Sequence, residues 1–169
     1  ESAPVKSEGV GEIVFQPECT CLCGSDLPYF SMLKEVQRLE VGHSLHEMIG
    51  SVVATNGNRF QPGERVLAVP VDQQGLFERF ILTEDRAIHI DKRIPEEQAL
   101  LAQPLGTVIF ALKKLPHILD QDVAVVGAGP IGQLFCAALR NLGAREIIAV
   151  DLLESRLEVS PNMGATHVV

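Results

Sequence analysis

The sequence predicts an α/β protein in which a small, mostly antiparallel β-domain comes first and a parallel βαβαβ unit follows. Three observations support this fold class. The first hundred residues contain short apolar runs that are rich in β-forming residues and separated by turn residues. Near Pro95 the spacing of the apolar residues becomes helical. Further along, two continuous apolar runs flank a glycine-rich turn, which is typical of buried parallel strands joined by a helix.

The composition of the 169-residue chain is that of a globular protein, with 46% hydrophobic and 21% charged residues. No apolar run approaches the roughly 20 residues that a membrane helix needs, and no secretory signal pattern is evident. The net charge of −8 disfavours nucleic acid as a partner, because phosphates attract basic surfaces. Cys19, Cys21 and Cys23 alternate, which on a strand is an awkward arrangement for disulfides, so we expect a reducing, cytoplasmic setting.

We expect the first domain to span residues 1–103. Turn sequences such as 55–58 and 61–64 separate its β-rich runs. These runs are residues 11–15, 48–54, 65–69, 77–82 and 87–90.

We expect the second domain to span residues 104–169. Helical spacing at 96–101 and 105–115 leads into it, Gly143 is a typical helix stop, and Pro161 should shorten the last helix. The predicted strands are Asp122–Val126, Glu146–Val150 and 166–169, and the helices between them are 131–142 and 153 to about 159. We expect the first two strands to be buried on both faces.

A glycine-rich turn, Gly127-Ala128-Gly129-Pro130-Ile131-Gly132, joins the first parallel strand to its helix. This strand–turn–helix context predicts a binding site for the pyrophosphate of NAD(H). Gly127 would permit the tight turn, Gly129 would let the backbone approach the phosphates, and Gly132 would let the helix pack against the strand. The helix N-terminus would add unpaired N–H groups and a partial positive charge. The alternative is a structural turn that binds no ligand.

Dinucleotide sites of this kind carry an acidic residue about 20 residues beyond the glycine turn. Asp151, at the end of the second parallel strand, has close to this spacing. Its carboxylate would accept hydrogen bonds from the adenosine ribose. Because its negative charge would repel a 2′-phosphate, the sequence favours NAD over NADP.

Four motifs occur in order along the chain: Cys23-Gly24-Ser25-Asp26, then His46-Glu47 with Gly50, then Gly63-Glu64-Arg65-Val66, then the glycine turn. Together they resemble the medium-chain dehydrogenase/reductase superfamily, the zinc alcohol and polyol dehydrogenases, over nearly the whole chain. The resemblance implies an N-terminal GroES-like β-barrel domain followed by a partial Rossmann domain with a doubly wound parallel sheet. It also implies an NAD-dependent oxidoreductase.

The resemblance further implies a catalytic zinc site that contains Cys23 and His46, with Glu47 as a ligand or a neighbouring carboxylate. Zinc binds sulfur, nitrogen and oxygen donors and, in catalytic sites, keeps one position open. Such a metal would polarise the oxygen of an alcohol or carbonyl substrate while hydride passes to or from nicotinamide. Ser25 matches the hydroxyl that begins the family's proton relay. Thr107 matches a position that touches the nicotinamide, although it could equally be a core helix residue.

Each metal candidate has a plainer interpretation. Cys23 could be a small buried hydrophobe, and His46 an ordinary hydrogen-bonded histidine. His43 is an alternative ligand, but Glu47 and Gly50 have the motif's spacing only from His46. We interpret Cys19 and Cys21, which lack the motif, as structural.

The chain departs from the family at three places. Leu45 stands where the family has glycine before the histidine, so the backbone there could differ. Gln103 stands at the usual third-ligand position, which weakens the site or transfers that role to Glu47. No cysteine occurs between Val66 and Phe80, so we expect no structural zinc.

The chain begins with Glu1 rather than Met and ends just after a predicted strand. We therefore expect it to be a fragment of a longer protein that forms a homodimer or homotetramer in its full-length form. Three hypotheses about function follow. The leading one is a zinc-dependent NAD-linked alcohol or polyol dehydrogenase acting on a small-molecule alcohol or carbonyl. The others are a zinc-free reductase of the same superfamily and a catalytically degenerate NAD(H)-binding protein.

Overall fold

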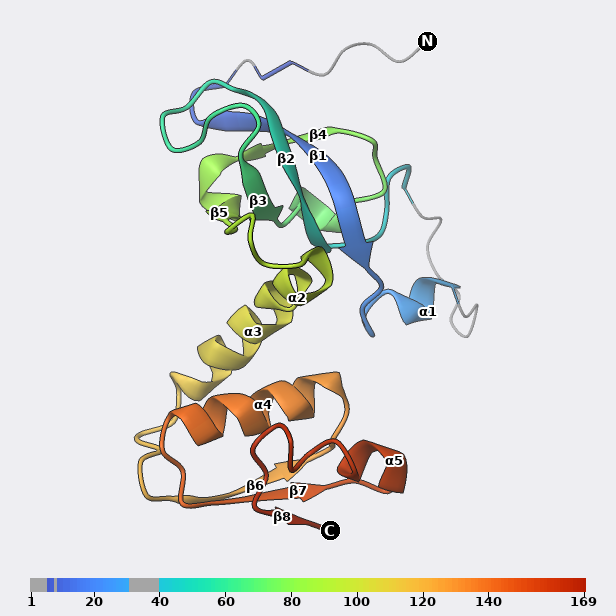
Figure 1. The fold of residues 1–169 in the computed structure, drawn as a ribbon. Coiled ribbons are helices and arrows are strands. Elements are labelled where there is room, and N and C mark those ends of the chain that lie inside the picture. Colours follow the sequence, from blue (N-terminus) through green and yellow to red (C-terminus); the bar gives the residue numbers. More distant parts are fainter. Residues whose placement is uncertain (1–5, 8, 31–39) are drawn as a thin grey trace. The chain divides into compact units, whose positions relative to one another are not determined.

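The computed structural model describes residues 6–7, 9–30 and 40–169, and Figure 1 shows the order of its elements. The chain divides into two compact units, Glu1–Gln103 and Pro104–Val169. The first unit is built on an antiparallel sheet, and the second on a parallel sheet.

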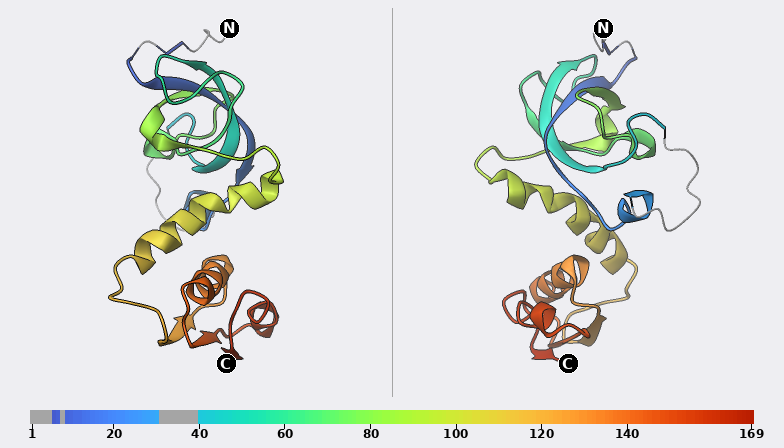
Figure 2. Two further views of the ribbon diagram at one scale, coloured as in Figure 1. Left: turned by 60° about the vertical axis from the view of Figure 1, so that its left-hand side comes forward. Right: turned by 90° about the vertical axis from the view of Figure 1, so that its right-hand side faces the viewer.

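A five-stranded sheet in the order β4-β1-β2-β3-β5 forms the first unit. Every paired neighbour runs antiparallel, and the sheet curls on itself as a half-barrel (Figure 2). Its strands are β1 (Glu12–Cys21), β2 (Glu47–Thr55), β3 (Arg65–Ala68), β4 (Phe80–Thr83) and β5 (Ala87–His89). Its short helices are α1 (Leu27–Phe30) and α2 (Glu96–Leu100), with 3₁₀ turns η1 (Val71–Gln73) and η2 (Glu84–Arg86).

Strand β1 is longer than the sequence predicts, because it continues past Pro17 to Cys21. The register of its pairing with β2 shifts between Pro17 and Cys19. Such an irregularity is where a strand tolerates proline, which cannot donate a ladder hydrogen bond. Beyond the shift, Cys21 pairs with Glu47. The extension therefore brings the cysteine-rich segment beside the start of β2.

The concave side of the curled sheet encloses the main core of the first unit. Phe15 and Phe80 meet edge to face, with ring centroids 5.3 Å apart. The buried residues of this core are Ile13, Phe15, Leu45, Met48, Val52, Phe60, Val66, Ala68, Phe80, Leu82 and Ala87. A smaller cluster on the other side of β2 and β3 joins Ile49 and Leu67 to Ala99 and Leu100, and so anchors α2 to the sheet.

The second unit contains a three-stranded parallel sheet in the order β6-β7-β8. Its strands are β6 (Asp122–Val126), β7 (Glu146–Val150) and β8 (His167–Val168). Its helices are α3 (Ala102–Leu112), which begins just before the unit boundary, α4 (Pro130–Asn141) and α5 (Glu154–Leu157). Helix α4 lies along one face of the sheet (Figure 1). Its Leu134, Cys136 and Leu139 pack in one core with Val125 and Ile147.

The expectation that the first two parallel strands are buried on both faces is wrong for β6. Val125 points into the core and is 9% exposed, whereas Val126 is 84% exposed. The reason is that, in the part of the chain that the structure describes, α3 and α4 supply the core on one face only. A continuous apolar run therefore does not distinguish a strand covered on both faces from one covered on a single face.

The predicted combination of an antiparallel β-domain and a parallel α/β unit is confirmed. Within the described ranges, every helix is too short or too polar to cross a membrane.

Candidate functional site

Three side chains of the first unit converge at the point where β2 begins. One potential ligand atom from each of Cys23, His46 and Glu47 lies within 4.8 Å of the other two. Cys23 and His46 are half-buried, and Glu47 is buried. Among the described residues, this is the one cluster of three His, Cys, Asp or Glu side chains that is close enough to hold a metal ion.

The pairing of β1 with β2 explains why residues so distant in sequence meet. Cys21 pairs with Glu47 across the ladder, and the Thr20 hydroxyl donates a hydrogen bond of 3.0 Å to the Glu47 carbonyl oxygen. Cys23 follows β1 by two residues, and His46 directly precedes β2. The end of one strand and the beginning of the next therefore present their side chains at the same edge of the sheet.

Asp26 fixes the two segments relative to each other, and its side chain is fully buried. Its Oδ2 accepts a hydrogen bond of 2.8 Å from the Cys23 N–H, and its Oδ1 accepts one of 3.2 Å from the Leu45 N–H. Burial alone would raise the pKa of Asp26. The backbone hydrogen bonds and the attraction to His46 outweigh that influence and lower the pKa, so the buried carboxyl carries a negative charge.

Leu45 adopts the left-handed backbone conformation that glycine favours, with φ of 70°. A leucine thus occupies a conformation that glycine favours, at a cost of about 1–3 kcal/mol. The Leu45 side chain is 7% exposed and belongs to the main core, which offsets the strain.

One unpartnered atom of this region belongs to a residue of the cluster and fits a metal ion. Within the described residues, His46 Nδ1 is buried and has no hydrogen-bond partner. Such an atom is costly unless something binds it. A thiol, an imidazole and a carboxylate form a donor set that zinc prefers, and three protein ligands leave a fourth position open. His43, the alternative ligand, is outside the cluster. Its ring packs edge to face against the Tyr29 ring, with the ring centroids 4.5 Å apart.

The structure also places the other residues of the first unit that the sequence analysis named. Ser25 is exposed in the turn between Cys23 and α1, and Gln103 is half-buried in the first turn of α3. Cys19 and Cys21 lie on β1, and all four cysteines are free of disulfides. Cys21 is exposed overall, but partial desolvation of its thiol and the neighbouring Glu47 carboxylate raise the pKa of that thiol.

The glycine turn of the second unit has the geometry of a strand–turn–helix connection. Gly127 has φ of 101°, in the region that favours glycine. A Cβ atom on Gly132 would lie 1.8 Å from the carbonyl oxygen of Gly127, so only glycine fits there. A Cβ on Gly129 would meet no protein atom within 4 Å. By helix geometry, the N–H groups of Ile131 and Gly132 have no acceptor within α4. The turn therefore offers open space beside donors that the helix itself does not use.

Asp151 lies next to this turn, and its side chain is 7% exposed. Its Oδ2 accepts a hydrogen bond of 2.8 Å from the Ala128 N–H, and its Oδ1 accepts one of 2.9 Å from the Leu153 N–H. The Arg156 guanidinium lies 3.3 Å from Oδ2. The Leu153 and Ala128 amides, followed by Arg156, lower the pKa of Asp151. Thr107, the other predicted cofactor contact, is exposed on α3.

Three residues that matter to these sites were not singled out from the sequence. Asp26 was part of a motif but had no predicted role, and neither Gln133 nor Arg156 belongs to a motif. Gln133 offered a weak signal, because it is a polar residue in an otherwise apolar stretch of α4, Ile131 to Leu139.

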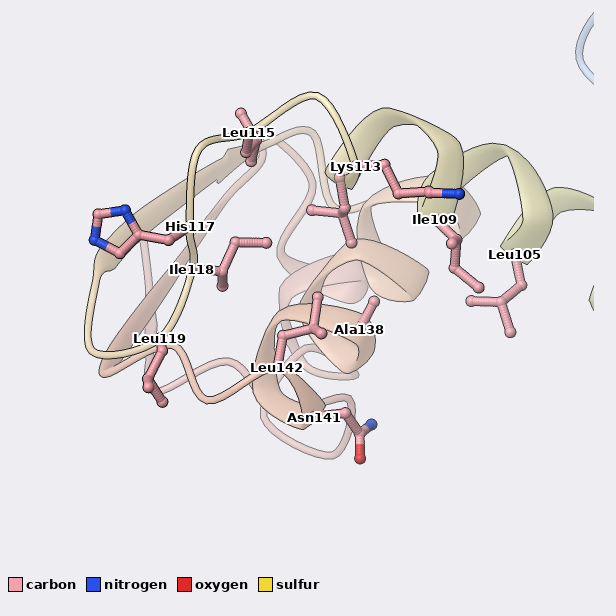
Figure 3. Close-up of a pocket in the computed structure, with 11 residues that line it drawn as sticks. Leu105, Ile109, Lys113, Leu115, His117, Ile118, Leu119, Ala138, Asn141 and Leu142 are labelled. Carbon is pink, nitrogen blue, oxygen red and sulfur yellow. The ribbon is translucent and has the colours of Figure 1, made fainter.

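An apolar cavity of about 670 Å³ occurs elsewhere in the second unit (Figure 3). It lies between α3, the following loop and the C-terminal part of α4. Leu105, Ile109, Ile118, Ala138 and Leu142 are among its lining residues. None of the predicted site residues lines it, since the glycine turn is at the opposite end of α4.

Comparisons with known proteins give dehydrogenases and, among the solved structures, a quinone oxidoreductase, although no family model matches the chain. L-Threonine 3-dehydrogenase of Legionella pneumophila (strain Corby) is 26% identical over 199 residues, which cover all of this chain and 58% of that enzyme. Galactitol-1-phosphate dehydrogenase from Escherichia coli has a TM-score of 0.84 at 21% identity, covering 99% of this chain and 56% of that one. Alcohol dehydrogenase TADH from Thermus sp. ATN1 has a TM-score of 0.83 at 23% identity, and the match covers 99% of this chain and 58% of that enzyme.

The predicted resemblance to the zinc-type medium-chain alcohol and polyol dehydrogenases is confirmed by these relatives. The solved structures confirm the GroES-like plus Rossmann fold class. The chain spans somewhat more than half the length of the curated relatives that it matches.

Replacing Gly129 with alanine separates a ligand-binding turn from a merely structural one. We expect Gly129→Ala to fold with a loss of no more than about 1 kcal/mol, the usual size of a change at a helix N-cap. The new methyl group meets no protein atom, but it would occupy space needed by a pyrophosphate. The Kd for NADH, measured by calorimetry, should rise at least about tenfold. Gly132→Ala, whose methyl group would collide with Gly127, should impair both folding and binding. Unchanged NADH affinity in Gly129→Ala would show that the turn is structural.

The pH dependence of stability should report the hydrogen bonds of Asp151. Because the pKa is lower in the folded chain than the value of about 3.9 in an unfolded one, ionised Asp151 stabilises the fold above that pH. This contribution is lost as the pH falls through the folded pKa. Urea unfolding at pH 6 should therefore show Asp151→Asn to be less stable than the wild type. The difference should shrink below about pH 4; a difference that stays constant down to pH 2.5 would contradict this account.

Proposed function

We propose that the chain belongs to an NAD-linked, zinc-dependent alcohol or polyol dehydrogenase, a class that moves a hydride between an alcohol carbon and nicotinamide. The observation that carries the proposal is the convergence of Cys23, His46 and Glu47. The glycine turn and Asp151 add a second site suited to a dinucleotide.

In this proposal Cys23, His46 and Glu47 hold one zinc ion. Bound zinc supplies a Lewis acid that polarises an alcohol or carbonyl oxygen. Glu47 replaces the anionic ligand that Gln103, being neutral, does not provide. Asp26 holds the ligand-bearing segments in register through the Cys23 and Leu45 amides. Ser25, whose side chain is exposed two residues from Cys23, accepts the alcohol proton and passes it on.

The dinucleotide part of the proposal rests on the second unit. The Ile131 and Gly132 amides and the partial positive charge at the start of α4 favour a pyrophosphate. Asp151 is the candidate acceptor for the adenosine ribose hydroxyls, and its charge favours NAD over NADP. Thr107 is the candidate contact to the nicotinamide.

Relatives named for their substrates act on small molecules, L-threonine and galactitol 1-phosphate among them. We infer a substrate of the same general kind, an alcohol or the matching carbonyl compound. A cytoplasmic setting fits the four free cysteines. Assembly of the whole protein into two or four copies is part of the same proposal.

Zinc content tests the proposed ligand set. We expect the wild type, dialysed against a zinc buffer, to retain about one zinc ion per chain, and Cys23→Ala to bind zinc at least about tenfold more weakly, since it loses the thiolate ligand. Cys21→Ala is the matched control, because Cys21 is exposed and outside the three-residue cluster. Inductively coupled plasma mass spectrometry measures the metal directly.

Activity assays with a panel of alcohols and ketones separate the competing functions. Wild type without zinc, together with full activity in Cys23→Ala, would overturn the zinc mechanism. Full turnover after exhaustive chelation would favour a zinc-free reductase. Tight NADH binding without turnover of any compound would favour a nucleotide-binding protein that is not an enzyme.

A further inference from the structure

Gln133 lies in α4 directly after the glycine turn, and its side-chain amide reaches two other segments of the second unit. Its Nε2 lies 2.8 Å from the Ala128 carbonyl oxygen and 2.9 Å from the Arg156 carbonyl oxygen. The Ser160 hydroxyl is also within reach, at 3.0 Å. An amide NH₂ group has two hydrogens, so it can donate to both carbonyls at once. Gln133 thus ties the glycine turn to the segment that carries Arg156.

These contacts close a ring of four residues. Gln133 donates to the Ala128 carbonyl, the Ala128 N–H donates to Asp151, and the Arg156 guanidinium donates to Asp151. The Arg156 carbonyl then accepts from Gln133. Ala128 is consequently held through both its N–H and its carbonyl oxygen. The turn and the acidic residue beside it form one hydrogen-bonded unit.

Helix α5, which contains Arg156, has four residues. A helix this short has little stability of its own, because helix nucleation is costly. Its placement beside the glycine turn depends on contacts from outside: the ring supplies polar contacts, and Leu157 packs against the core of the second unit. The Ser160 hydroxyl also donates a hydrogen bond of 3.3 Å to the Arg156 carbonyl oxygen and so helps to hold Arg156 in place.

We propose that Gln133 is a positioning residue for the adenosine half of the dinucleotide: through the Ala128 and Arg156 carbonyls it sets the distance between the pyrophosphate-binding turn and the ribose-binding Asp151. This inference rests on the proposed function of the glycine turn. It goes beyond that function because Gln133 would touch neither the phosphates nor the ribose. A leucine at this position would keep the side-chain volume and lose both donors.

Calorimetry with ADP-ribose and with NADH, on the full chain, tests the proposal. In Gln133→Leu both Kd values should rise about tenfold, since two hydrogen bonds that organise the site are lost. The thermal unfolding midpoint should fall by only a few degrees, because two carbonyls lose a donor while the leucine still packs at a half-buried helix position. Gln133→Glu, which has the same size but no donors, should lose affinity as Gln133→Leu does. Gln98→Leu, on the exposed face of α2, is the matched control.

A double-variant comparison separates positioning from packing. If Gln133 acts through its donors, the losses of ADP-ribose affinity caused by Gln133→Leu and Ser160→Ala should be less than additive in the double variant, because both residues hold the Arg156 carbonyl in one network. Additive losses would overturn the proposal. So would wild-type affinity in both Gln133→Leu and Gln133→Glu. A wild-type chain that binds neither ADP-ribose nor NADH would instead overturn the proposed function itself.

If the Gln133 variants do not fold, nuclear magnetic resonance of the wild type tests the proposal instead. The side-chain amide hydrogens of Gln133 should exchange with solvent more slowly once ADP-ribose is bound, because the ring tightens around the ligand. Unchanged exchange and unchanged chemical shifts at this amide would overturn the inference.

Discussion

The buried carboxylate of Asp26 is the constraint on which the candidate metal centre depends. It accepts hydrogen bonds from the Cys23 and Leu45 amides, which belong to the loops that follow β1 and precede β2 at the same end of the β1–β2 pairing. A buried charge is costly unless hydrogen bonds compensate it, so the two loops must stay where their N–H groups reach the carboxylate. The positions of Cys23 and His46 follow from this requirement together with the register that pairs Cys21 with Glu47.

The Asp151 carboxylate has a similar structural role in the second unit. Asp151 accepts from Ala128 and Leu153 and so joins the glycine turn to the end of β7. In both units an aspartate satisfies backbone amides of a loop that lies beside the candidate chemistry. Loops of this kind carry function when a rigid scaffold holds them. Here the scaffold is a sheet edge, and the hydrogen bonds of the aspartate hold the loop in a fixed position beside it.

Much of this could be predicted from the sequence, and the exceptions have physical causes. Continuous apolar runs located Asp122–Val126 and Glu146–Val150 at their observed bounds. The extension of β1 past Pro17 was missed, because proline ordinarily ends a strand unless the ladder is irregular there. The exposed face of β6 was missed because coverage of a sheet depends on tertiary packing. The roles of Asp26 and Gln133 depend on backbone groups of distant segments, which no local pattern records.

X-ray absorption at the zinc edge, on the wild-type chain loaded with one equivalent of zinc, tests the central claim most directly. We expect one sulfur ligand at about 2.3 Å, from Cys23, with the remaining nitrogen and oxygen ligands at about 2.0–2.2 Å. The sulfur should disappear from the spectrum of Cys23→Ala and persist in that of Cys21→Ala. A zinc coordination shell without sulfur, or one with several sulfur ligands from the neighbouring cysteines, would contradict the proposed ligand set.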